Sequence, residues 1–189
     1  QWIGKGTGTW AGWSFPWAAI IHARTGQTEA SINWLHYWKD NFTNEGRGAL
    51  SNANTMGHSL FAQPIWSKLP ENTPNREVMQ LDAGFGALTA VYELLVQNRL
   101  DGIYVLPDLP IYWKNLSFQD IWVEGGFKIS SKVEGGKVVE VKIKSTREES
   151  IKLYHNLGEK YLLNNLPKTG KVFERKMKAG DEFVLAKSN

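Results

Sequence analysis

The chain has 189 residues with 42% hydrophobic and 22% charged residues, which is ordinary for a globular protein with a buried core. No apolar run reaches the roughly 20 residues of a membrane-spanning helix, so no membrane association is expected. The net charge of +3 arises in residues 101–189, where lysines alternate with apolar residues instead of clustering as a nucleic-acid-binding surface requires.

Helical periodicity marks the first half of the chain. Apolar residues recur at intervals of three and four over 13–24, and Gly26 follows where a glycine commonly ends a helix. A second apolar face over 28–42 predicts an αα-hairpin. After an irregular stretch, a third helix is predicted over 85–98. We expect its apolar side to be buried, namely Leu88, Val91, Tyr92, Leu95 and Val96.

After Arg99 the apolar period changes to two, which is typical of strands. Residues 134–137 (Glu-Gly-Gly-Lys) predict a hairpin turn. The spacing of the strands favours an antiparallel sandwich. The sequence therefore predicts an α+β protein with a helical domain over 1–99 and a β-sandwich domain over 100–189. The predicted strands are 103–105, 118–123, 127–133, 138–145, 151–154, 161–163, 172–176 and 183–186.

Three motifs occur in the order and at the spacing of one known family. They are Gly-Trp-Ser-Phe-Pro-Trp at 12–17 with Ala-Arg at 23–24, Gln-Leu-Asp-Ala-Gly-Phe-Gly at 80–86, and Leu-Pro-Asp-Leu-Pro at 106–110 with Gly-Gly-Phe at 125–127. Together they resemble glycoside hydrolases of family 95, the α-L-fucosidase type. The resemblance implies the last helices of an (α/α)6 toroid followed by a β-sandwich. It also implies that the whole protein is secreted or periplasmic.

The resemblance further implies inverting hydrolysis of α-L-fucosyl or related terminal sugars, with Asp82 as general base. Inversion needs two carboxyl groups about 6.5–9.5 Å apart, which leaves room for the water that the base activates. The family's general-acid glutamate would precede this chain, whose first residue is Gln1, so we expect the chain alone to be incomplete and inactive. The residues themselves leave another interpretation open: Asp82 caps the third helix by accepting hydrogen bonds from the N–H groups of Gly84 and Phe85.

The predicted substrate-binding residues are Trp13, Arg76 and Gln80. Trp13 either stacks on a sugar ring or packs between helices, and for Trp17 helix packing is favoured. Arg76 stands where the family has a histidine, and Gly84 stands where it has an asparagine. These differences support an alternative in which a catalytically lost protein serves as a carbohydrate-binding or structural domain.

No metal or cofactor is expected. Cysteine is absent, and the four histidines lack the spacing of a zinc site. The implied partner is a glycan or oligosaccharide substrate. Because a partial barrel exposes the apolar faces between its helices, we also expect either the missing N-terminal part of the protein or self-association to cover them.

Overall fold

The computed structural model describes residues 7, 10–51 and 78–188, and Arg76 lies outside these ranges. The chain forms two compact units, residues 1–93 and 94–189. This division falls a few residues before the predicted domain boundary at residue 99. No helix in the described ranges is long and apolar enough to cross a membrane.

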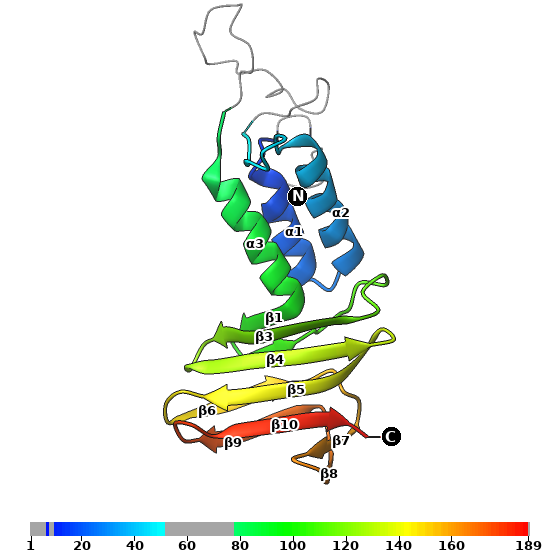
Figure 1. The fold of residues 1–189 in the computed structure, drawn as a ribbon, viewed down its shortest axis with the longest axis vertical. Coiled ribbons are helices and arrows are strands. Elements are labelled where there is room, and N and C mark those ends of the chain that lie inside the picture. The colour runs from blue at the N-terminus through cyan, green and yellow to red at the C-terminus, as the bar shows by residue number, and fades with distance from the viewer. Residues whose placement is uncertain (1–6, 8–9, 52–77, 189) are drawn as a thin grey trace, which may run out of the picture. The chain divides into compact units, whose positions relative to one another are not determined.

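The described residues of the helical part form three helices (Figure 1): α1 (Ser14–Arg24), α2 (Thr28–Asn41) and α3 (Leu81–Leu95). The first two lie where the periodicity predicts them. The third begins four residues earlier than predicted and ends three residues earlier. The prediction overran because the apolar run continues without a break from Leu94 through Val96, where the backbone pairs with a neighbouring strand.

An aromatic cluster forms the core of the first unit. Phe15 is fully buried, and its ring lies 4.8 Å from Phe42 and 4.9 Å from Tyr37, measured between ring centroids. Trp10 is 3% exposed and packs edge-on against Phe15. The segment that follows α2 returns to this core, because the backbone of Leu50 forms a β-bridge with Met79 just before α3.

Ten strands form the second unit. They are β1 (Val96–Arg99), β2 (Gly102–Val105), β3 (Leu116–Val123), β4 (Phe127–Glu134), β5 (Lys137–Ser145), β6 (Glu149–Tyr154), β7 (Lys160–Leu163), β8 (Leu166–Thr169), β9 (Val172–Met177) and β10 (Glu182–Lys187). One sheet has the order β1-β2-β6-β9 and the other β3-β4-β5-β10-β7-β8. All strand pairings are antiparallel except that of β2 with β6, which is parallel. The prediction of an entirely antiparallel sandwich is therefore wrong for this one pair.

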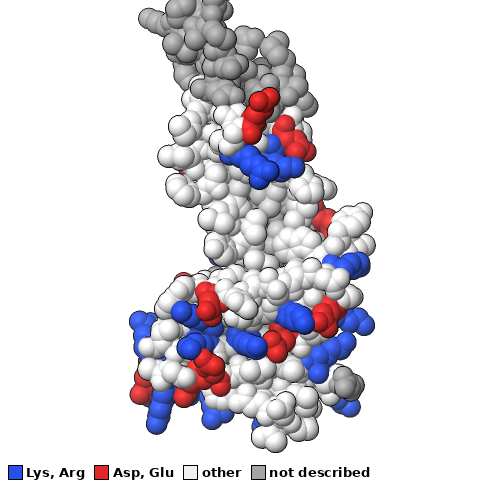
Figure 2. All heavy atoms as spheres, in the orientation of Figure 1, with Lys and Arg blue, Asp and Glu red and all other residues white. Residues whose placement is uncertain are grey.

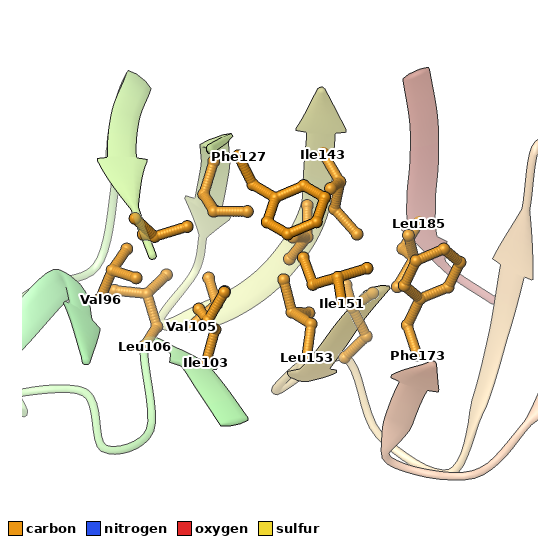
Figure 3. Packing of buried hydrophobic residues seen from close by; sticks show 14 of the residues in the cluster. Val96, Ile103, Val105, Leu106, Phe127, Ile143, Ile151, Leu153, Phe173 and Leu185 are labelled. Carbon is orange, nitrogen blue, oxygen red and sulfur yellow. The ribbon is translucent and has the colours of Figure 1, made fainter. Parts of the chain in front are cut away.

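The hydrophobic core of the second unit lies between its two sheets. Figure 3 shows Phe127 and Ile143 pointing toward Ile151 and Leu153, and all four side chains are at most 2% exposed. They belong to one continuous buried cluster. The predicted α+β class, with helices followed by a predominantly antiparallel β-domain, is therefore confirmed.

Two tight hairpin turns explain where the strand predictions succeeded and failed. Gly135 and Gly136 both adopt positive φ, as a two-residue turn between β4 and β5 requires. Asn164 and Asn165 do the same between β7 and β8. Strand β8 was not predicted, because all four of its residues are exposed and no buried face sets a period of two.

Candidate active site

Asp82 lies in the first turn of α3, on the surface of the helical unit. Its carboxylate forms no hydrogen bond or ion pair with the described residues, so the interpretation as a cap that binds the N–H groups of Gly84 and Phe85 is not supported. The helix begins one residue before Asp82, which places this side chain inside the helix and not at the N-cap position. The carboxylate is therefore available to a ligand.

Gln80 and Trp13 meet at the base of α3. The backbone N–H of Trp13 donates a hydrogen bond of 2.9 Å to Oε1 of Gln80. The backbone of Gln80 is itself fixed, because its N–H donates to the carbonyl oxygen of Ala49 and its carbonyl oxygen accepts from Ala83. Trp13 and Gln80, two of the predicted site residues, are thus in direct contact. Gln80 lies two positions before Asp82 in the chain.

The Trp13 ring lies at the surface and stacks on that of Trp17. The two ring centroids are 5.0 Å apart, and Trp13 is 36% exposed while Trp17 is 47% exposed. The interpretation of Trp17 as a core residue is wrong for the described structure. Trp10 is instead the tryptophan of this segment that enters the core. The Trp13–Trp17 pair offers an exposed aromatic surface to which a sugar ring can bind by stacking.

An ion pair joins the far ends of α1 and α3. Nε and Nη2 of Arg24 donate to the two carboxylate oxygens of Glu93 at 2.9 and 2.8 Å. The Glu93 side chain is 12% exposed, and its hydrogen bonds raise the pKa of Arg24. Near the middle of α3, a Cβ on Gly86 would lie 3.1 Å from Cβ of Pro16. Both contacts hold α3 against α1.

The apolar side of α3 differs most from the prediction. Its buried residues in the helical unit are small, namely Ala83, Ala87 and Ala90, whereas the large apolar residues face solvent. Phe85 is 68% exposed, and Leu88 is 53% exposed. The prediction that this face is buried is therefore wrong for Leu88, Val91 and Tyr92. The exposed residues of this face are Leu81, Phe85, Leu88, Val91 and Tyr92, here called the α3 apolar face.

The sequence is similar to that of a named protein. The chain is 30% identical over 168 residues to α-L-fucosidase 2 of Arabidopsis thaliana, a match that covers 86% of this chain and 17% of that protein. The chain is therefore similar in sequence to part of an α-L-fucosidase. It spans about a sixth of the length of this relative.

Two further comparisons are less informative. No family model matches the chain. Among solved structures, Ara127N-Se, a GH127 β-L-arabinofuranosidase from Geobacillus stearothermophilus T6, is similar over 88% of this chain and 28% of that chain, with 12% identity and a TM-score of 0.37. This likeness is too weak to support an inference about the site.

The described residues bring Trp13 and Gln80 together, and Asp82 is exposed two positions after Gln80. They contain no cluster of three histidine or acidic residues able to hold a metal. The contact between Arg24 and Glu93 was not predicted, although Arg24 belongs to the first quoted motif. A pairing of residues 69 positions apart has no signal in a single sequence.

Proposed function

We propose that the chain is the C-terminal portion of a secreted or periplasmic family 95 glycoside hydrolase that removes α-L-fucosyl or related terminal sugars with inversion. Asp82 is its general base. The observation that carries this proposal is the exposed Asp82 carboxylate, which has no hydrogen-bond or ion-pair partner among the described residues and sits in the motif that resembles the family's base-bearing segment. An acceptor of a proton from water must be both accessible and free of competing ion pairs.

The contacts around Asp82 fit a positioning role for its neighbours. Gln80 is held by Trp13 through its side chain and by Ala49 through its backbone, which fixes the entry of the chain into α3. Because α3 begins directly after Gln80, the Asp82 carboxylate emerges from a defined backbone position. Trp13, whose backbone N–H is bonded to the Gln80 side chain, then provides an aromatic surface on which a sugar ring can stack.

A second carboxyl group must act as general acid, and Glu93 does not fit that role. It lies eleven positions along α3 from Asp82, roughly 16 Å at the 1.5 Å rise per residue of a helix. That separation exceeds the roughly 6.5–9.5 Å of inverting glycosidases. Glu93 is also bound to Arg24 through both oxygens. The general acid is therefore the one that the family resemblance implies, a glutamate that precedes this chain.

The α3 apolar face supports the same conclusion. Phe85 and Leu88 are more than half exposed, and the ten residues from Ala83 to Tyr92 include no charged side chain. Soluble proteins rarely leave such a large apolar patch uncovered. In the whole enzyme, the preceding part of the helical barrel would cover this face. In the isolated chain, self-association would cover it instead.

One alternative function is favoured by a specific observation. Gly84 replaces the family's asparagine beside Asp82, while the exposed Trp13–Trp17 pair keeps an aromatic surface suited to sugars. A protein with this combination would bind a glycan without cleaving it. The alternative is therefore a catalytically lost carbohydrate-binding or structural domain of a family 95-like protein.

The test is hydrolysis of an α-L-fucoside by the complete protein and its Asp82→Asn variant. Loss of a general base lowers the rate by about 10²–10⁴-fold. Asp40→Asn on the exposed end of α2 is the matched control and should retain the rate. Undiminished hydrolysis by Asp82→Asn would refute the assigned role. Binding of fucosylated oligosaccharides without turnover by the unmodified protein would favour the alternative.

A further inference from the structure

A β-bulge interrupts β3 on the outer face of the six-stranded sheet. Between the pairs Phe118–Ser131 and Ile121–Ile129, two residues of β3, Gln119 and Asp120, oppose the single residue Ser130 of β4. Asp120 has a φ of 54°, and its N–H donates to Oγ of Ser130 at 3.0 Å. Bulges of this kind redirect side chains and are frequent next to binding sites.

The bulge opens a polar depression of about 310 Å³ across β3, β4 and β5. That volume is at the lower end of the roughly 300–1,000 Å³ range of small-molecule sites. Its lining combines hydroxyl, amide, carboxylate and ammonium groups: Ser117, Gln119, Asp120, Ser130, Glu140 and Lys142. The depression thus offers hydrogen-bond donors and acceptors side by side.

Trp122 lies on the same face of the sheet, beside the residues that line this depression. It pairs with Lys128 across β3 and β4, and Ser130 is its diagonal neighbour on the same face. Trp122 is 60% exposed, and Nζ of Lys128 lies 4.7 Å from the centroid of its ring. A large apolar ring is therefore held at the surface beside a row of polar side chains.

The charges around the depression are balanced, which restricts the chemistry of a ligand. Figure 2 shows lysines and acidic residues intermixed over the sheet formed by β3, β4, β5 and β10. Lys142 pairs with Glu140 at 3.2 Å, and Lys132 pairs with Glu134 at 2.6 Å. A phosphate would meet the carboxylates of Asp120 and Glu140, and a metal ion would meet the lysines. The hydroxyl groups of a neutral polyhydroxylated ligand can donate to the carboxylates and accept from the lysine ammonium groups.

From these observations we infer a saccharide-binding site on the β-domain, in which a neutral sugar ring stacks on Trp122 and its hydroxyl groups bond to Asp120, Ser130 and Lys142. The apolar C–H face of a sugar fits the indole ring, and its rim of hydroxyls fits the mixed donors and acceptors. The site lies entirely within the second unit and does not depend on Asp82. It would hold a glycan chain in addition to the residue being cleaved.

The experiment is an amide chemical-shift titration of the 189-residue chain. The probes are methyl α-L-fucopyranoside and 2′-fucosyllactose, with inorganic phosphate and glycerol as comparison ligands. We expect saturable shifts at Gln119, Asp120 and Ser130 with at least one saccharide and none with phosphate or glycerol. Absence of saturable shifts with both saccharides overturns the inference, as does saturable binding of phosphate at the same residues.

Variants separate this site from a non-specific effect. Trp122→Ala should raise the saccharide dissociation constant by at least about tenfold, which equals ~1.4 kcal/mol. Asp120→Asn, which tolerates the positive φ, should also weaken binding. The matched control is Tyr112→Ala, which removes an 84% exposed aromatic ring elsewhere in the unit. Equal affinity of the Trp122→Ala variant and the unmodified chain overturns the site. Asp82→Asn should leave the titration unchanged, so failure here is distinct from failure of the proposed catalytic role.

Discussion

Gly12 and Leu50 lie so close together that no side chain fits between them. A Cβ atom on Gly12 would approach the carbonyl oxygen of Leu50 far more closely than the 3.0 Å limit observed for real Cβ atoms. The contact is locked in place, because the N–H of Gly12 donates to the carbonyl oxygen of Ser51 at 3.0 Å. The glycine that begins the first motif is therefore required by the approach of another backbone segment.

The first prediction concerns this contact. Gly12→Ala should lower the free energy of unfolding of the helical unit by at least about 2 kcal/mol, because the backbone at Leu50 cannot move away without breaking its bridge to Met79. Chemical denaturation monitored by tryptophan fluorescence measures this free energy of unfolding, since seven of the nine tryptophans lie in residues 1–93.

The control for Gly12→Ala is Gly46→Ala in the turn after α2. A Cβ there meets only the side-chain oxygen of Asn44, at 3.4 Å. Its effect on the free energy of unfolding should stay within about 0.5 kcal/mol, as for most surface changes. If the two substitutions have the same effect, the proposed overlap at Leu50 does not exist in solution.

The second prediction concerns the bidentate ion pair between Arg24 and Glu93. Arg24→Lys keeps the charge but cannot bind both carboxylate oxygens in the same planar geometry. Because Glu93 is largely buried while Arg24 is half exposed, we expect a loss of about 1 kcal/mol in denaturation experiments.

The matched pair for this prediction is Lys39 and Asp40 on α2, which are both mostly exposed. Lys39→Ala should change the stability by less than about 0.5 kcal/mol. A double-mutant cycle with Glu93→Gln would isolate the coupling between the two side chains. No measurable coupling would show that the pair does not fasten α3 to α1.

The elements that were predicted correctly bury one face within their own unit. Helix α1 and strands such as β4 show this, since their buried residues recur with the expected period. Strand β1 was missed because it continues the apolar run of α3, and its role depends on pairing with β2. A single apolar run does not show where a helix becomes a strand.

The site was only partly predictable for a similar reason. The positions of Asp82, Gln80 and Trp13 came from motifs, and the contact between Trp13 and Gln80 joins residues 67 positions apart. Such a contact depends on the whole unit. The exposure of Leu88 was also missed, because periodicity marks an apolar face but does not say whether its partner lies in the same chain.

The third prediction concerns the pH dependence of the β-domain. His155 is 5% exposed, packs on Tyr161 and has no hydrogen-bond partner for either ring nitrogen in the part of the chain that the structure describes. Burial lowers the pKa of His155 from 6.5 to about 4, and the nearby Glu159 carboxylate partly opposes this shift. As the pH falls, the unfolded chain takes up the proton before the folded one.

The stability linked to His155 is therefore complete above pH 6.5 and is lost progressively as the pH falls toward 4. The full loss is on the order of 3 kcal/mol. Hydrogen-exchange protection of the β-strand amides, measured across this range, should decline in the unmodified chain. His155→Phe should remove this part of the decline, whereas His36→Gln on the exposed side of α2 should not. An identical pH profile for His155→Phe would contradict the prediction.

The fourth prediction concerns the α3 apolar face. Leu88 projects from the middle of a stretch without charge, and burying it against a second surface would be favourable by about 1.5–3 kcal/mol for one fully covered leucine. The isolated chain should therefore self-associate in a concentration-dependent way in sedimentation-velocity experiments. Leu88→Glu should shift it toward the monomer, because a charge in the contact would have to be desolvated. Asn33→Glu adds the same charge to an exposed position on α2 and should leave association unchanged. A folded chain that stays monomeric at all concentrations would show that this face needs no cover.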